Sequence, residues 1–122
     1  MSNSSKNLYK KLLGAKGESL TIKYLKKKGY TILERNYSLP VGEADIIAKK
    51  DNEIVFVEVK TRTSTKFGMP NEAVDYKKQQ KYKNLALLYI QKNQIDDSIV
   101  ISFAISEVLN GEINFIEEAF LW

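Results

Sequence analysis

Apolar residues recur at intervals of three and four positions along the first part of the chain, from about Asn7 to Lys28. This spacing predicts a helix with one apolar face, formed by Leu8, Leu12, Ala15, Ile22 and Leu25. The helix is expected to end at Gly29, because three lysines precede it and cations stabilise a helix C-terminus. Glycine also adopts the left-handed conformation that commonly terminates helices.

β-Branched and aromatic segments separated by turn-forming residues predict strands in most of the remaining chain. The predicted elements are, in order, strands over 30–37, 43–49 and 53–61, a loop over 64–71, a helix over about 72–91, and strands over 98–108 and 112–117. Two-residue turns are expected at Asp51-Asn52 and Asn110-Gly111. The order predicts a mixed α/β fold with helices packed on a sheet of about five strands. Without repeats or low-complexity tracts, one domain is expected over residues 1–122.

The first of these hairpins gathers charged residues on one face. With a two-residue loop at 51–52, Asp45 lies opposite Glu58 and Glu43 lies opposite Lys60. The other face is wholly apolar and consists of Ala44, Ile46, Ala48, Val55, Val57 and Val59. Opposed side chains have Cβ atoms about 5 Å apart, so Asp45 and Glu58 are expected to repel each other.

A bound divalent cation would remove this repulsion, because both carboxylates would become its ligands. A register shift of two residues would still leave Asp45 and Glu58 as diagonal neighbours about 7–8 Å apart. The alternative is a salt-bridged cluster, in which Lys60 pairs with Glu43 or Glu58 and Asp45 is solvated at a sheet edge.

Glu18 shares the apolar stripe of the first helix with Ile22 and Leu25. A carboxylate that faces a sheet is costly unless it has a partner. Glu18 therefore either extends past the core to water or reaches over the sheet face to complete a metal site.

Histidine and cysteine are both absent from the chain. Their absence excludes histidine general bases, Ser-His-Asp sites, cysteine nucleophiles, disulfides and cysteine- or histidine-based zinc sites. Catalysis would use carboxylates, lysine, hydroxyls or a metal held by oxygen ligands, which favours Mg²⁺ or Mn²⁺. The net charge of +4 is compatible with a polyanionic partner. The sequence has neither a signal-peptide pattern nor an apolar run of membrane-spanning length, so a cytoplasmic protein without a membrane partner is expected.

Metal-dependent hydrolysis of a phosphodiester needs few protein groups. Asp45 and Glu58 would hold Mg²⁺ (or Mn²⁺), with the Val59 carbonyl as an additional ligand and Glu18 as a supporting one. Lys60, two residues after Glu58 on the same strand face, would orient the attacking water or stabilise developing negative charge.

Candidate phosphate contacts flank this end of the predicted strands and give affinity without sequence specificity. They are Arg62, Lys66, Lys78 and Gln79. For each of them the alternative is an ordinary solvated surface residue.

Two segments, Glu43–Ile47 and Val55–Arg62, resemble the Asp…Glu-x-Lys core of the restriction-endonuclease-like superfamily. More closely, the chain resembles the YraN-like family of small bacterial proteins from Gly14 to about Ala86. The segments that carry this likeness are Gly14–Glu18, Gly29–Tyr37, Gly42–Glu43, Glu58–Arg62, Phe67–Gly68, Glu72–Val74 and Lys78–Gln79. That family is in turn similar to archaeal Holliday junction resolvases.

The resemblance implies a restriction-endonuclease-like fold and a magnesium-dependent endonuclease acting on DNA, branched or otherwise structured DNA included. It matches the first-helix glutamate of the superfamily to Glu18, its metal aspartate to Asp45, and its Glu-x-Lys to Glu58 and Lys60. Symmetric cutting of both strands of a junction would favour a homodimer. Two alternatives remain open: a nucleic-acid-binding module with a vestigial nuclease site and no turnover, and a protein-interaction domain whose acidic cluster is a salt-bridge network.

One segment departs from the family pattern. Where the family usually carries Arg-Phe-Asp on its late strand, this chain has Ser102-Phe103-Ala104. The missing charges either had a structural role that apolar packing replaces here, or they helped to bind DNA or to hold a dimer.

Overall fold

The structure is a computed structural model that describes residues 3–62 and 74–122. Within these residues, helices and strands follow the predicted order of helix, three strands, helix and two strands. The elements are α1 Asn3–Lys27, β1 Thr31–Leu39, β2 Gly42–Lys50, β3 Glu53–Arg62, α2 Tyr76–Lys92, β4 Val100–Leu109 and β5 Glu112–Ile116. The predicted loop over 64–71 lies outside the described residues. Neither of the described helices is long and apolar enough to cross a membrane.

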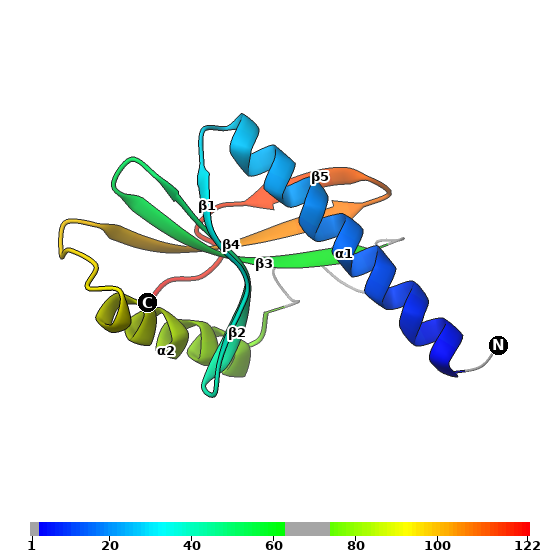
Figure 1. Ribbon diagram of the computed structural model, residues 1–122, viewed down its shortest axis with the longest axis horizontal. Helices are drawn as coiled ribbons and strands as arrows, with labels where there is room; N and C mark the ends of the chain where they lie inside the picture. The colour runs from blue at the N-terminus through cyan, green and yellow to red at the C-terminus, as the bar shows by residue number, and fades with distance from the viewer. Residues whose placement is uncertain (1–2, 63–73) are drawn as a thin grey trace.

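The five strands form one sheet in the order β1-β2-β3-β4-β5. All neighbouring strands are antiparallel except β3 and β4, which are parallel. A parallel pair needs a crossover connection, and α2 lies in the chain between these two strands. Figure 1 shows α1 crossing one face of the sheet and α2 lying on the other. The predicted mixed α/β fold is therefore confirmed.

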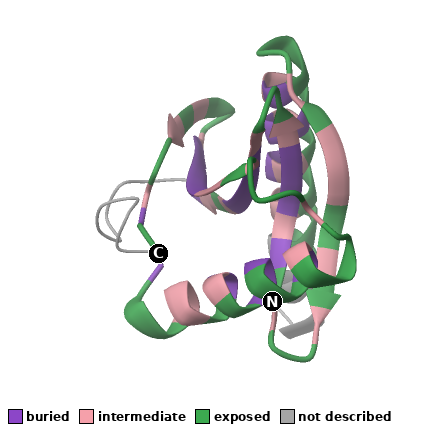
Figure 2. Ribbon diagram, turned by 90° about the vertical axis from the view of Figure 1, so that its left-hand side faces the viewer, coloured by how far each residue is buried: buried purple, intermediate pink, exposed green. Residues whose placement is uncertain are grey.

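Each face of the sheet carries its own core. The core under α1 consists of Ile22, Leu25, Ile46, Ala48, Val55, Val57 and Ala104. The core under α2 includes Ile47, Phe56, Tyr82, Leu85, Tyr89 and Phe103. Successive residues of a strand point to opposite faces, so the central strands must be apolar on both sides. Figure 2 shows the resulting concentration of buried residues on the inner strands and on the inward sides of the helices.

Both predicted two-residue turns are confirmed. The pairs Lys50–Glu53 and Leu109–Glu112 close them. In the second turn, Asn110 and Gly111 have φ values of 52° and 83°. These are the left-handed values that a type I′ turn requires, and asparagine and glycine adopt them readily.

The helix ends are set by local capping. Gly29 has a φ of 97°, and the Tyr30 N–H donates to the Leu25 carbonyl at 2.9 Å, which ends α1 where the sequence predicts. Helix α2 begins later than the predicted start near residue 72. The Asp75 carboxylate accepts a hydrogen bond from the Lys78 N–H at 2.9 Å and caps the helix there.

The apolar stripe of α1 is buried only along its C-terminal part. Ile22 and Leu25 belong to the core, but Leu8 and Leu12 are 58% and 62% exposed and Ala15 is exposed as well. The N-terminal end of α1 extends beyond the sheet (Figure 1), whereas Leu13 lines a cavity together with Thr61 and Val108. The predicted helix is confirmed, but its apolar spacing does not show which part of the apolar face is covered by other elements.

Gly17 is buried where α1 approaches β3. A Cβ atom at this position would lie 2.0 Å from Thr61 Oγ1, whereas a Cβ atom at Gly14 would have nothing within 4 Å. We expect Gly17→Ala to lower the free energy of unfolding by about 1–3 kcal/mol through steric overlap. This loss should outweigh the higher helix propensity of alanine, which is worth about 1 kcal/mol.

Gly14→Ala is the matched control for this substitution. It gains the same helix propensity without an overlap, so it should raise the free energy of unfolding by about 0.5–1 kcal/mol. Urea unfolding of both variants measures the difference. Equal stabilisation by the two substitutions would show that α1 does not need the close approach to β3.

Candidate functional site

Asp45 lies where β2 separates from β3. The pairing of these strands follows the predicted register from Lys50–Glu53 as far as Ile46–Val57, where it ends. Beyond that point Asp45 Oδ2 accepts a hydrogen bond from the Val59 N–H at 2.7 Å. The Asp45 side chain thus takes the place of a strand carbonyl as the acceptor for this β3 amide.

The separation of the strands corrects one part of the sequence prediction. Asp45 was expected directly opposite Glu58, and Glu43 directly opposite Lys60, but neither pair is formed in the ladder. Ala44 also packs in the core under α2, not on the predicted face with Ile46. The alternation of β2 therefore changes at its N-terminal end, which the sequence pattern alone did not reveal.

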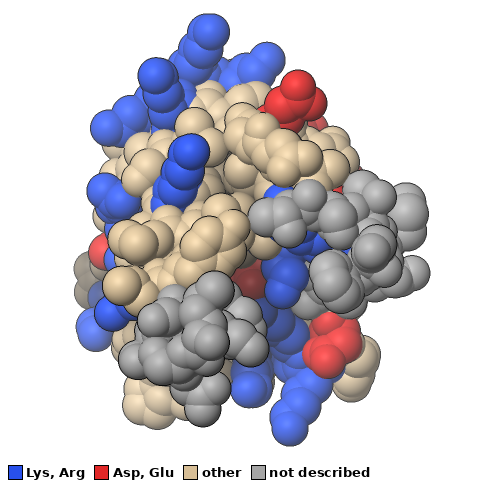
Figure 3. All heavy atoms as spheres, turned by 90° about the vertical axis from the view of Figure 1, so that its right-hand side faces the viewer, with Lys and Arg blue, Asp and Glu red and all other residues tan. Residues whose placement is uncertain are grey.

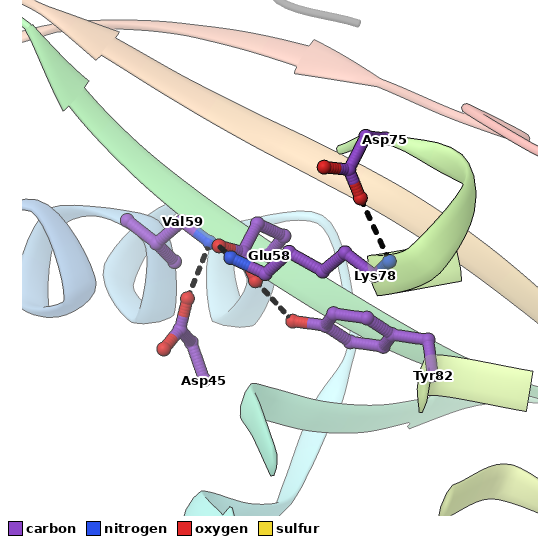
Figure 4. Close-up of polar contacts among 6 residues, drawn as sticks. All are labelled: Asp45, Glu58, Val59, Asp75, Lys78 and Tyr82. Carbon is purple, nitrogen blue, oxygen red and sulfur yellow. Dashed lines mark hydrogen bonds and ion pairs between the residues drawn. The ribbon is translucent and has the colours of Figure 1, made fainter. Parts of the chain in front are cut away.

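Glu58 is a buried carboxylate on β3 with two partners from α2. Its Oε1 accepts from Lys78 Nζ at 2.5 Å, and its Oε2 accepts from the Tyr82 hydroxyl. Figure 4 shows Lys78 and Tyr82 reaching from the helix to Glu58, with Asp45 bonded to Val59 beside them. The Glu58 side chain is only 11% exposed, so these charge-assisted bonds are made in a site with little water.

The two carboxylates act on each other electrostatically. Burial, followed by the negative charge of Glu58, raises the pKa of Asp45 from 3.8 to about 7. The hydrogen bond from Val59 and the charge of Lys78 oppose this rise, and the charge of Glu18 adds to it. Burial and the same Glu58 charge also raise the pKa of the Tyr82 hydroxyl well above its usual value. The predicted repulsion between Asp45 and Glu58 is therefore present without direct opposition in the ladder.

The other two predicted core residues lie at the margins of this pair. Glu18 is half-buried on α1 and contributes to the electrostatic environment of Asp45. Lys60 is exposed two residues beyond Glu58 on β3 and forms no ion pair within the described residues. In the parts of the chain that the structure describes, no group of three or more acidic side chains is arranged to hold a metal ion. The site is thus a carboxylate pair, and the Val59 carbonyl stays a predicted further ligand.

A carboxylate pair offers the oxygen ligands that Mg²⁺ and Mn²⁺ prefer. Mg²⁺ usually binds through one or two protein carboxylates and keeps several of its waters. The raised pKa of Asp45 also identifies a place where a positive charge would relieve an unfavourable interaction.

A groove adjoins this pair on the α2 side. It has a volume of about 570 Å³ and lies between the β1–β2 turn and the first two turns of α2. Its lining residues are Ser38, Leu39, Pro40, Val41, Gly42, Glu43, Asp75, Lys77, Lys78, Lys81 and Tyr82. Figure 3 shows one side of the molecule, where Lys and Arg side chains cover more of the visible surface than Asp and Glu side chains.

The predicted phosphate contacts are distributed unevenly around this groove. Lys78 lines it, whereas the Gln79 amide donates to the Val74 carbonyl at 3.1 Å and so supports the start of α2. Arg62 is buried at the end of β3 and lines a different cavity, beside α1. Lys66 lies outside the described residues.

Two residues near the site were not predicted from the sequence as part of it. Tyr82, expected only on the apolar side of the second helix, donates to Glu58. Tyr82 follows Lys78 by four residues, so both side chains lie on one face of the helix. This spacing was the signal in the sequence that Tyr82 could accompany Lys78 at the site. Glu107 is 5% exposed on β4 and pairs in register with Lys60. It is the only charged residue of that strand, which makes it unusual in the sequence.

The segment that departs from the expected family pattern lies in the middle of β4. Phe103 and Ala104 are each 1% exposed and belong to the two opposite cores. Phe103 stacks on Phe120 with ring centroids 4.7 Å apart. Phe103 and Ala104 thus contribute apolar packing to both faces of the sheet, and the two explanations for the missing charges stay open.

The fold and the site define a mixed α/β protein with two adjacent carboxylates beside a lysine-lined groove. The chain belongs to the uncharacterised protein family UPF0102, whose family model matches residues 17–108. Membership of the YraN-like family, predicted from the sequence, is thereby confirmed. The matched range includes Glu18, Asp45, Glu58, Lys60 and Lys78.

Relatives in several bacteria carry the same family name. A UPF0102 protein of Caldanaerobacter subterraneus is 55% identical over 85 residues, 70% of each chain. One of Thermodesulfovibrio yellowstonii is 49% identical over 108 residues, 88% of this chain and 95% of the relative. One of Clostridioides difficile is 48% identical over 106 residues, 85% of this chain and 92% of the relative.

Proposed function

We propose that this chain is a metal-dependent endonuclease that hydrolyses phosphodiester bonds in DNA, with branched or structured DNA as its favoured substrate. The proposal depends chiefly on one observation: Asp45 and Glu58 lie together in a partly dehydrated site where their charges oppose each other. The resemblance of the surrounding segments to restriction-endonuclease-like enzymes supports DNA as the substrate.

Each residue of the site has a defined part in this proposal. Asp45 and Glu58 hold Mg²⁺ or Mn²⁺, and Glu18 and the Val59 carbonyl supply further oxygen atoms. When bound, the ion polarises the scissile phosphate and lowers the pKa of a coordinated water. The exposed Lys60 ammonium stabilises negative charge that develops on the phosphate oxygens.

The contacts around the pair support its role by fixing the carboxylates. The Val59 N–H holds one oxygen of Asp45, and the Tyr82 hydroxyl holds one oxygen of Glu58. Residues that orient metal ligands in this way commonly change metal affinity or activity by about 10–100-fold. The lysines of the groove, Lys77, Lys78 and Lys81, offer phosphate contacts beside the pair.

Calorimetric titration with Mn²⁺ and Mg²⁺ tests the proposal. We expect the wild type to bind and Asp45→Asn and Glu58→Gln each to weaken binding by roughly 100-fold, because each removes the charge of one of the two principal carboxylate ligands. Glu43→Gln is the matched control, since Glu43 is an exposed carboxylate on the same strand as Asp45 and outside the pair.

Cleavage of labelled four-way junction, duplex and single-stranded DNA in Mg²⁺ then tests the substrate class. Faster cleavage of the junction than of the duplex is expected. Absence of metal binding by the wild type, even with DNA present, would refute the nuclease proposal.

One contact favours the alternative of a nucleic-acid-binding module without turnover. The Lys78 ammonium already neutralises Glu58 without any metal ion. This alternative predicts DNA binding that weakens steeply with salt, because phosphate contacts release counterions, and no cleavage in either Mg²⁺ or Mn²⁺. The titration and the cleavage measurement together separate the two functions.

A further inference from the structure

Lys78 belongs to both the carboxylate pair and the groove. Its Nζ lies 2.5 Å from Glu58 Oε1, and its side chain also lines the groove beside the β1–β2 turn. The side chain is 43% exposed, whereas that of Glu58 is 11% exposed. The ammonium therefore has a route to solvent that the carboxylate lacks.

The groove offers an anion more than one cation. Lys77 and Lys81 are exposed and line it together with Lys78. Of the two acidic residues in the lining, Asp75 already accepts a hydrogen bond from the Lys78 backbone N–H. A solvent-open groove with three lysines suits the phosphates of a nucleic-acid backbone, which lysine binds as a point charge.

Lys78 and a metal ion would both bind the Glu58 carboxylate. Two positive charges at one carboxylate would repel each other in a site with little water. Glu58 would not be left without support if the ammonium moved away, because the Tyr82 hydroxyl holds the other oxygen. The flexible stem of lysine allows its ammonium to move while the backbone of α2 stays in place.

We infer that Lys78 occupies the cation position at Glu58 in the metal-free protein and moves to a backbone phosphate of DNA in the groove when a divalent ion binds. This inference rests on the proposed function. Metal binding releases Lys78 from Glu58, so that Lys78 can contact the DNA phosphate. DNA binding holds Lys78 away from Glu58 and leaves the carboxylate to the metal, so each ligand favours the binding of the other. By thermodynamic linkage, bound metal raises the affinity for DNA by the same factor by which bound DNA raises the affinity for metal.

Lys78→Met tests the first half of this exchange. Without the competing ammonium, Mn²⁺ binding measured by calorimetry in the absence of DNA should tighten by about 10-fold, since a charge-assisted bond to Glu58 no longer has to be broken. Lys77→Met is the matched control: it removes the same charge from the same helical turn, but Lys77 does not contact Glu58. Its effect should stay below about 3-fold, because solvent and salt screen a more distant charge.

DNA binding tests the second half. Fluorescence anisotropy of a labelled DNA duplex is measured in Ca²⁺, chosen as a divalent ion in place of Mg²⁺ so that cleavage does not interfere, and in EDTA. Lys78→Met should weaken binding by about 10-fold in Ca²⁺ and by less than about 2-fold in EDTA, where the wild-type ammonium is held by Glu58. Lys77→Met should weaken binding equally in both conditions. Lys78→Gln, which keeps a long polar side chain, repeats both measurements in case the methionine variant is unstable.

The outcomes distinguish this inference from the proposed function. If the wild type binds Mn²⁺ and the Lys78→Met and Lys77→Met variants bind it equally, the exchange is refuted and the metal site stands. Equal losses of DNA affinity in Ca²⁺ and EDTA for Lys78→Met would also refute it. If neither the wild type nor the Lys78 variants bind Mn²⁺, both the metal site and the exchange fail.

Discussion

Asp45→Asn is expected to make the metal-free protein more stable at pH 8, by about 2–4 kcal/mol, while it weakens metal binding by roughly 100-fold. Burial and the charge of Glu58 raise the pKa of Asp45 to about 7. The unfolded chain keeps the ordinary value near 3.9. Asparagine carries no charge, but its carbonyl oxygen can still accept the hydrogen bond from the Val59 N–H.

The pH dependence follows from the direction of this shift. Between about pH 4 and pH 7 the folded protein keeps the Asp45 proton that the unfolded chain has lost. The folded state thus binds more protons, and the stability contributed by Asp45 falls as the pH rises through this window. Burial makes the largest contribution to this effect, the charges of Glu58 and Glu18 increase it, and the Val59 hydrogen bond and the charge of Lys78 reduce it. The difference in the free energy of unfolding between Asp45→Asn and the wild type should be near zero at pH 4 and constant above about pH 8.

Urea unfolding across this pH range, with EDTA present, measures the effect. Glu43→Gln, an exposed carboxamide substitution on the same strand, should change stability by less than about 0.5 kcal/mol throughout. Mn²⁺ at a concentration that saturates the wild type should stabilise the wild type more than Asp45→Asn, because the stabilisation by a ligand grows with its affinity for the folded protein. If Asp45→Asn is as stable as the wild type at both pH 4 and pH 8, the ionised Asp45 carboxylate does not destabilise the folded protein.

Lys60→Met is expected to slow DNA cleavage by roughly 100- to 1,000-fold, the usual cost of removing a group that stabilises charge in the transition state. The same substitution should leave the Mn²⁺ affinity within about 3-fold of wild type, because Lys60 is exposed and solvent screens its charge. The rate falls without loss of metal because the Lys60 ammonium acts on the phosphate and not on the carboxylates.

Single-turnover cleavage with saturating Mg²⁺ is the appropriate measurement, since it separates chemistry from product release. Lys23→Met provides the control, because Lys23 is an exposed lysine on α1. Cleavage by Lys60→Met at the rate of Lys23→Met would exclude Lys60 from the reaction. A parallel loss of Mn²⁺ affinity would instead indicate that Lys60 maintains the carboxylate pair.

The sequence by itself determined the order of the elements, the two hairpin turns and the end of α1. These features depend on neighbouring residues: the left-handed φ of Gly29 and Asn110 and the alternation of apolar positions in β2 and β3. It also identified Asp45 and Glu58 as mutually repelling carboxylates, because a two-residue turn fixes the register of the two strands that it joins.

The tertiary structure decided how those carboxylates are held. The strands separate beyond Ile46, so Asp45 bonds to a backbone N–H and not across a ladder to Glu58. Lys78 and Tyr82 reach Glu58 from positions 20 and 24 residues away. Their convergence depends on where α2, which lies in the crossover between β3 and β4, docks on the sheet.

The same limit applies to the first helix. Its apolar repeat predicted a helix with one apolar face, but only packing against the sheet determined that Leu25 is covered and Leu12 is exposed. Local spacing defines which side chains share a face, since it follows from the helical repeat. Which partner meets that face depends on the packing of segments distant in the chain, and no short-range pattern encodes it.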